Sequence, residues 1–119
     1  MLVGNSANIE YVGGIANAAA FLFICLMKAQ LIISDKSVGE DGGTLQIVIW
    51  KVPEPVPPTT HGFKYRLAYI RNGRRVVGFD NERGKGDHKH VGNGEYPYEF
   101  STVRQLLEDF SSEVEKWKE

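Results

Sequence analysis

The dipeptide Asn72-Gly73 is the feature of this sequence that most restricts its fold. Both residue types tolerate the positive φ angles of a type I′ turn, the tight connection preferred between two antiparallel strands. Residues 63–70 before it alternate aromatic and aliphatic side chains with basic ones, and residues 74–79 after it return as a second strand. We therefore predict a β-hairpin whose first strand has an apolar face and a charged face.

Two more strands are expected before this hairpin. Residues 28–34 have the composition of a strand, and residues 44–52 alternate between two faces with the period of two that a sheet requires. The polar, glycine-containing residues 35–43 between them are expected to form the reversing turn. Four prolines in residues 53–60 are incompatible with a central strand and predict an extended linker at an edge or on the surface.

The C-terminal part of the chain predicts one helix. Residues 80–94 are charged and glycine-rich without an apolar period, so we expect an exposed loop there. Ser101 or Thr102 can cap the helix that follows, with Gln105 completing a capping box. Apolar residues then recur at helical spacing and predict a stripe that packs on the sheet: Val103, Leu106, Leu107, Phe110, Val114 and Trp117. The predicted fold is α+β, an antiparallel sheet of about four strands with one C-terminal amphipathic helix packed on it.

Chain length and cysteine content exclude several classes of protein. A chain of 119 residues forms one domain, too small for separate cofactor and substrate domains. The single cysteine, Cys25, cannot form an internal disulfide or a thiolate metal cage, so disulfide-rich secreted domains and cysteine-based zinc modules are excluded. A reducing cytoplasm is the expected location.

The first 26 residues differ from the rest of the chain. Their only charge is Glu10, and the apolar run 15–27 is shorter than the roughly 20 residues needed to cross a bilayer. No positive segment precedes that run, as a signal peptide would require. We expect residues 1–26 to be a leader translated from an early start, or alternatively a weak N-terminal helix or anchor, and residues 27–119 to be the single domain.

Charge is segregated along the chain although the total is only -1. Residues 61–90 contain eight positive and three negative residues and all three histidines, whereas residues 91–119 contain three positive and seven negative residues. The segment 80–90, DNERGKGDHKH, combines cations for phosphate, glycines for close backbone approach and histidines for proton transfer. If it is extended, His88 and His90 point the same way. A solvated polar loop without catalysis is the competing interpretation.

The sequence supports a metal site or a nucleotide-binding loop less well than a phosphate-binding site in residues 80–90. His88 and His90 with His61 or Asp87 could supply three metal ligands, but the chain has no HExxH, CxxC or EF-hand pattern. The glycines around Lys85 do not fit the frame of a nucleotide P-loop. We therefore predict no metal site and no cofactor.

Three segments carry a family resemblance. Residues 48–55 (VIWKVPEP), 63–67 (FKYRL) and above all 76–90 (VVGFDNERGKGDHKH) resemble the TumE-type toxins of bacterial and archaeal toxin-antitoxin modules. The resemblance covers residue 27 to about residue 117. It implies a small cytoplasmic toxin whose partner is an antitoxin with a helix-turn-helix DNA-binding domain. It points to these recurrent positions: Tyr65, Asp80, Asn81, Asp87, His88 and His90.

The function predicted from the sequence is a type II toxin that cleaves RNA without a metal, by analogy with other small toxins. His88 and His90 are the predicted acid and base, and Asp80 orients a histidine. Basic and aromatic residues are predicted to bind the substrate: Arg83, Lys85, Lys89, Arg66 and Tyr65. The alternative is a non-enzymatic module that binds its antitoxin or nucleic acid. A metal-dependent nuclease is the third possibility.

Overall fold

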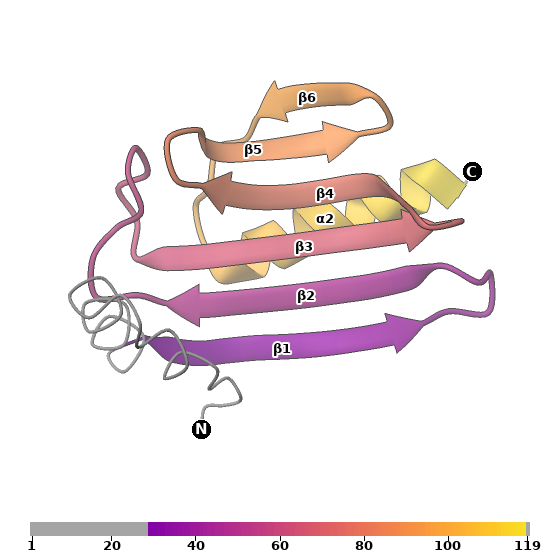
Figure 1. Ribbon diagram of the computed structural model, residues 1–119, viewed down its shortest axis with the longest axis horizontal. Helices are drawn as coiled ribbons and strands as arrows, with labels where there is room; N and C mark the ends of the chain where they lie inside the picture. The colour runs from indigo at the N-terminus through magenta and orange to yellow at the C-terminus, as the bar shows by residue number, and fades with distance from the viewer. Residues whose placement is uncertain (1–28, 119) are drawn as a thin grey trace, which may run out of the picture.

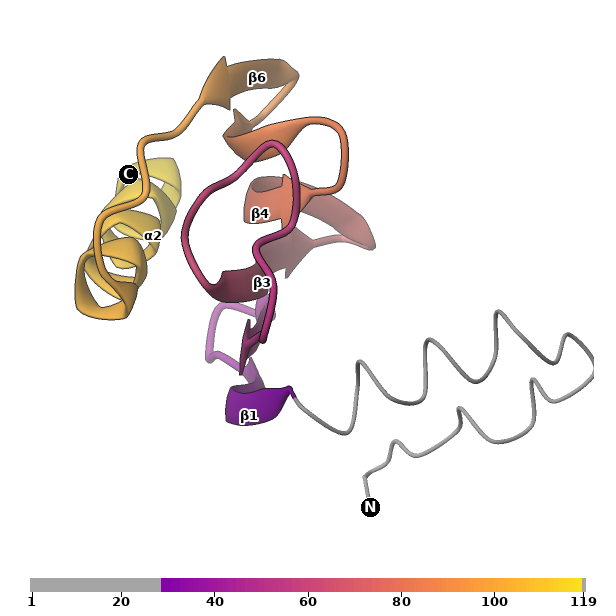
Figure 2. The same ribbon diagram turned by 90° about the vertical axis from the view of Figure 1, so that its left-hand side faces the viewer.

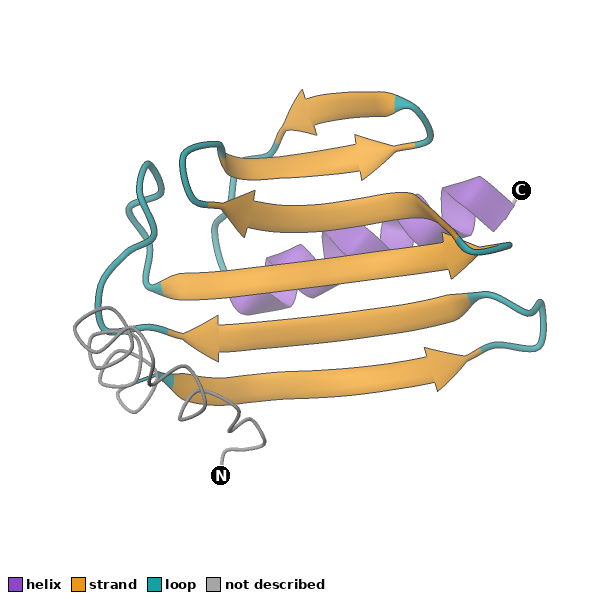
Figure 3. Cartoon of the chain, viewed as in Figure 1, coloured by secondary structure: helices purple, strands orange, loops and turns teal. Residues whose placement is uncertain are grey.

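The computed structural model describes residues 29–118, which form one six-stranded antiparallel sheet followed by a helix. The strands lie in sequence order, each hydrogen-bonded to the next (Figure 1). Figure 3 shows that turns and loops join them, the longest between β2 and β3. The elements are β1 (Gln30–Val38), β2 (Thr44–Lys51), β3 (Phe63–Arg71), β4 (Arg74–Glu82), β5 (Gly86–Val91), β6 (Gly94–Pro97) and α2 (Val103–Lys118).

Helix α2 packs against one face of the sheet (Figure 2). Within the described residues no helix covers the opposite face, which we call the open face. The core lies between α2 and the middle strands because the alternating apolar residues of β2, β3 and β4 all face the helix. Its buried members are Ile49, Tyr65, Leu67, Tyr69, Val76, Val77, Phe79, Leu106, Phe110 and Val114.

The predicted hairpin and the third strand are confirmed. Asn72 and Gly73 have φ angles of 53° and 75°, as a tight turn between β3 and β4 requires. The predicted helix is also confirmed, because Gln105 N donates to Thr102 Oγ1 at 3.0 Å and identifies Thr102 as the cap. The Gln105 side chain donates to Asp109 instead of returning to the cap, so the capping box is only half formed.

The prediction of about four strands is wrong, since the sheet has six. Residues 80–94, predicted to be an exposed loop, contain the end of β4, all of β5 and the start of β6. Asp87 and Lys89 lie at helix-facing positions of β5. Asp87 accepts a hydrogen bond from Tyr65, and Lys89 donates one to Glu113. A strand with polar residues on its covered face has no apolar period, so the pattern that reveals strands is missing here.

The first strand and turn also differ from their predicted positions. β1 continues to Val38 and pairs with β2 along its whole length, so the turn is confined to residues 39–43. Polar residues are tolerated in this part of β1 because it is an edge strand with mostly exposed side chains. The proline-rich residues 53–60 form a connection outside the sheet, as predicted.

Predictions about the beginning of the chain lie outside the described residues. These are the leader at residues 1–26, its alternative as an N-terminal helix or anchor, and the start of the first strand at Lys28. Within residues 29–118 there is no helix with the length and apolar character that crossing a bilayer requires.

Candidate functional site

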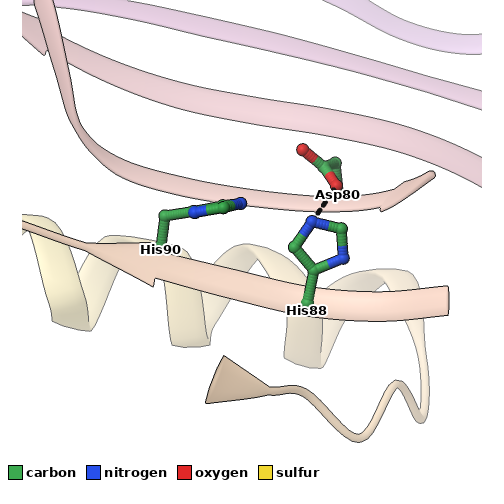
Figure 4. Close-up of side chains that lie close together, drawn as sticks. All are labelled: Asp80, His88 and His90. Atoms are coloured by element: carbon green, nitrogen blue, oxygen red, sulfur yellow. Dashed lines mark ion pairs between the residues drawn. The ribbon is translucent and has the colours of Figure 1, made fainter. Parts of the chain in front are cut away.

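Several predicted site residues meet on the open face because the strands are in register. Arg66 on β3 lies opposite Asp80 on β4, which in turn lies opposite His88 on β5. Residues opposite each other in an antiparallel sheet share a face, so the three side chains form a row across the sheet. His90 lies two residues beyond His88 and projects to the same side. We call Asp80, His88 and His90 the Asp-His-His cluster (Figure 4).

Asp80 and His88 are buried and closely apposed. His88 Nε2 lies 2.8 Å from Asp80 Oδ1, and the two side chains are 6% and 13% exposed. Despite this distance, the pair lacks hydrogen-bond geometry, and neither atom has another hydrogen-bond partner. The other ring nitrogen, His88 Nδ1, lies 2.8 Å from the carbonyl oxygen of Gly86. His88 is therefore held from one side by the backbone of its own strand.

His90 is the more accessible imidazole of the cluster. Its ring centroid lies 4.9 Å from that of His88, with the two planes at 78°. Its side chain is 21% exposed, compared with 6% for His88. Burial lowers the pKa of His90, and the neighbouring Arg75 cation lowers it further, whereas Glu95 opposes the shift. The arrangement thus favours a neutral imidazole at this position.

Arg75 is a cluster neighbour that sequence reasoning missed. The pairing of β3 with β4 shifts between Tyr69 and Ile70, so that Ile70 lies opposite Arg75 and Val76 is the extra residue. This bulge turns Arg75 onto the open face, where Nη1 lies 3.4 Å from Asp80 Oδ2. A strict alternation of faces would have assigned Arg75 to the helix side, which is why the sequence did not reveal it.

Gly78 provides the space that Arg75 occupies. A Cβ atom at residue 78 would lie 2.8 Å from both Cδ and Nε of Arg75. The guanidinium therefore reaches Asp80 across a position without a side chain.

Cations surround the cluster. A shallow hollow of about 400 Å³ lies on the open face, lined by Lys64, Arg66, Arg75, Asp80, Glu82, Lys85 and His90. Lys85 Nζ forms a 2.6 Å ion pair with Glu95 Oε2, which raises the pKa of Lys85 and lowers that of Glu95. Glu95 is also 3.6 Å from His88 Nε2 and was not identified from the sequence, because β6 was not predicted. The hollow suits an anionic group at a polar cluster.

Three of the five predicted substrate-binding residues do not line this hollow. Tyr65 is 1% exposed on the helix-covered face, and its hydroxyl donates to Asp87 Oδ1 at 2.6 Å. Lys89 also faces the helix, where Nζ lies 2.7 Å from Glu113 Oε2. Arg83 is exposed in the turn between β4 and β5 and does not line the hollow. Only Arg66 and Lys85 of the predicted set join the Asp-His-His cluster.

The metal ligand set considered from the sequence does not form. His61 Nε2 lies 2.8 Å from Asp87 Oδ1, and the His61 ring stacks on Phe100 with centroids 4.0 Å apart. Asp87 is opposite Asn81 and adjacent in β5 to His88, so it points to the other face of the sheet. Neither His61 nor Asp87 can complete a site with His88 and His90. Asp80 lies where such a third ligand would be needed.

Comparison with known proteins identifies a family. The family model described as Toxin TumE matches residues 27–118, which include every described strand and the helix. No curated protein and no solved structure matches the chain. Because the family match spans well over half of its length, the chain belongs to the TumE toxin family.

Proposed function

We propose that this TumE-family toxin acts on RNA and cleaves its phosphodiester backbone at the Asp-His-His cluster. The observation that carries the proposal is a hollow on the open face that His90, Asp80 and four basic residues line, with the buried imidazole of His88 next to His90 and Asp80. Phosphodiester cleavage needs groups that move protons and cations that stabilise charge on the phosphate oxygens. The hollow combines both.

The cations would hold the backbone of a single strand. Arg66 is exposed, and Lys64 and Arg75 are partly exposed, so all three can contact phosphates. Phosphate contacts of this kind dominate non-specific nucleic-acid affinity and depend strongly on salt. No aromatic residue lines the hollow, so base stacking is not part of the proposal.

The proposed reaction is attack of the ribose 2′-hydroxyl on the adjacent phosphorus. The new P–O2′ bond forms as the P–O5′ bond breaks, one group accepts the 2′-hydroxyl proton, and another donates a proton to the departing 5′ oxygen. His90 is the imidazole that a substrate can approach. The Nε2 atom of His88 is buried beside Asp80, so His90 is the imidazole that we assign to proton transfer with the substrate.

We also propose that the toxin belongs to a type II module and is neutralised by a protein antitoxin with a helix-turn-helix domain. Membership of the TumE toxin family supports a partner antitoxin. Co-expression of the neighbouring gene is expected to restore growth and to yield a complex that co-purifies with the toxin. Restored growth without a complex would contradict a type II module.

The direct test is incubation of the purified full-length protein with single-stranded RNA. We expect cleavage by wild type and a loss of about 10²–10⁴-fold in rate for His90→Ala, the usual contribution of a general acid or base. Arg104→Ala, an exposed helix substitution, is the matched control and should retain the wild-type rate. Intact RNA with folded wild type would overturn the proposal, and toxicity that persists in His90→Ala would favour the non-enzymatic alternative.

A further inference from the structure

The hydrogen bond at His88 Nδ1 determines which nitrogen carries the proton. Its partner is the Gly86 carbonyl oxygen, 2.8 Å away, and a carbonyl can only accept. Nδ1 must therefore carry the hydrogen. In the neutral ring, Nε2 then presents a lone pair.

That lone pair faces another acceptor. Asp80 Oδ1 lies 2.8 Å from His88 Nε2, and these two are the buried side-chain atoms of residues 29–118 that have no hydrogen-bond partner. A doubly protonated ring would carry a hydrogen on Nε2, but the pair lacks the geometry of a hydrogen bond. Two buried acceptors at this distance repel each other unless a proton or a cation lies between them.

The other histidine-aspartate pair in the fold shows how such a pair is normally satisfied. Phe63 N donates to His61 Nδ1 at 3.2 Å, so Nε2 carries the hydrogen and donates to Asp87 Oδ1 at 2.8 Å. Every polar atom of that ring has a partner. In the His88–Asp80 pair the backbone partner of Nδ1 is a carbonyl acceptor instead of an N–H donor. The ring hydrogen of neutral His88 is therefore on Nδ1 and not on the nitrogen that faces Asp80.

We propose that Asp80, His88 and His90 bind a divalent transition-metal ion on the open face. One ligand atom from each residue lies within 4.8 Å of the others. Metal–nitrogen and metal–oxygen bonds of about 2.0–2.2 Å place neighbouring ligands about 3 Å apart. Asp80 Oδ1 and His88 Nε2 already have that spacing. His90 is partly exposed and can approach by rotating its side chain.

The surroundings support this ligand set. Metal-binding histidines typically donate their second ring nitrogen to a backbone carbonyl or carboxylate, as His88 does to Gly86. Arg75 contacts the second oxygen of Asp80 and leaves Oδ1 free for the ion. Glu95 adds negative charge 3.9 Å from His90 Nε2, against the nearby cations Arg75 and Lys85. Two imidazoles and one carboxylate suit zinc and related ions and leave positions open for water or substrate.

Metal binding at this cluster does not depend on the proposed RNA cleavage, although it would change the route of that reaction. A bound ion would supply a water of lowered pKa and a contact for a phosphate oxygen. His90 would then act as a ligand, and the metal-free route predicted from the sequence would be replaced.

The test uses the untagged full-length protein after removal of metal with EDTA. Calorimetric titration with Zn²⁺ and the visible absorption of added Co²⁺ are expected to show saturable binding at a stoichiometry of one ion per chain. Zn²⁺ should also raise the midpoint of thermal unfolding. His90→Ala and Asp80→Asn should each weaken binding by more than the roughly 10–100-fold typical of losing a supporting residue. His61→Gln, the matched control outside the cluster, should bind as wild type.

The outcomes separate the metal site from the proposed function. Absence of saturable binding, or binding that His90→Ala leaves unchanged, overturns the metal site even if Asp80→Asn does not fold. RNA cleavage is measured in parallel with and without EDTA. Metal binding without any RNA cleavage overturns the proposed function and supports the site. Cleavage in EDTA, together with no saturable Zn²⁺ binding in the titration, supports the function and overturns the site.

Discussion

The hydroxyl of Tyr65 on β3 donates a 2.6 Å hydrogen bond to Oδ1 of Asp87 on β5, across the intervening strand β4. Burial, and then the hydrogen bond to Asp87, raise the pKa of Tyr65 far above its ordinary value. The same carboxylate oxygen contacts His61 Nε2. Tyr65 therefore connects strands and linker, which is a structural role different from the substrate contact predicted from the sequence.

Tyr65→Phe should destabilise the fold without changing RNA affinity. The variant leaves a partly buried carboxylate short of one donor, which costs about 1–3 kcal/mol. Each kcal/mol corresponds to about 4–8 °C in the thermal midpoint of a domain this size. Tyr96→Phe, at a 49% exposed position, is the control and should unfold as wild type. Unchanged stability together with weaker RNA binding would instead support the substrate contact.

Gly78→Ala should reduce activity while preserving the fold. The new methyl group displaces Arg75, whose flexible side chain can move, so we expect a stability change below about 1 kcal/mol. Loss of a charge-assisted contact at Asp80 should slow RNA cleavage about tenfold. The control is Gly62→Ala, where a Cβ meets nothing closer than 3.8 Å. Equal rates of RNA cleavage by Gly78→Ala and Gly62→Ala would show that Arg75 does not contribute to the site.

Arg66 and Lys89 should differ in their effect on RNA binding although both were predicted to contact substrate. Arg66 lines the hollow, whereas Lys89 is paired with Glu113 on the helix-covered face. Arg66→Ala should weaken binding and reduce the slope of log affinity against log salt by about 0.7, the value for one phosphate contact on a single strand. Lys89→Ala should leave that slope unchanged. The reverse result would place the RNA on the helix side.

Asp41 should contribute stability that acid removes. The hydrogen bond from Tyr69, and then that from Gly43 N, hold the pKa of Asp41 below its ordinary value of 3.8. A lowered folded-state pKa means that the contribution is complete above the unfolded value and is lost as pH falls through the folded value. Urea midpoints of wild type and Asp41→Asn should therefore differ by a constant amount from pH 7 to about pH 5 and converge below about pH 4. A gap that widens in acid would contradict this.

A chain that begins at Met27 should fold like the full chain. All buried core residues identified in the structure lie between Ile49 and Val114. Thermal unfolding and gel filtration of the two chains provide the comparison. A midpoint lowered by more than roughly 8 °C on truncation would show that residues 1–26 pack as part of the domain.

The sequence alone predicted the elements whose signals are local. The Asn72-Gly73 turn, the alternation in β2 and β3, and the helical stripe through Leu106 and Phe110 each depend on residues a few positions apart. Side-chain period and turn chemistry follow from backbone geometry, so these predictions hold whatever the rest of the chain does. The shared direction of His88 and His90 was likewise predicted, on condition that the segment is extended.

Only the tertiary structure decided the last two strands, β5 and β6, and which side chains meet at the Asp-His-His cluster. β5 and β6 carry polar residues whose partners lie far away in sequence, such as Tyr65 for Asp87 and Glu113 for Lys89, so no local pattern marks them as strands. Arg75 joins the site because a bulge inserts one residue and changes the face of its neighbour. Asp80 meets His88 because the register of β4 with β5 places them opposite each other. Strand register and long-range pairing are properties of the whole sheet, and these are the features that assemble the Asp-His-His cluster.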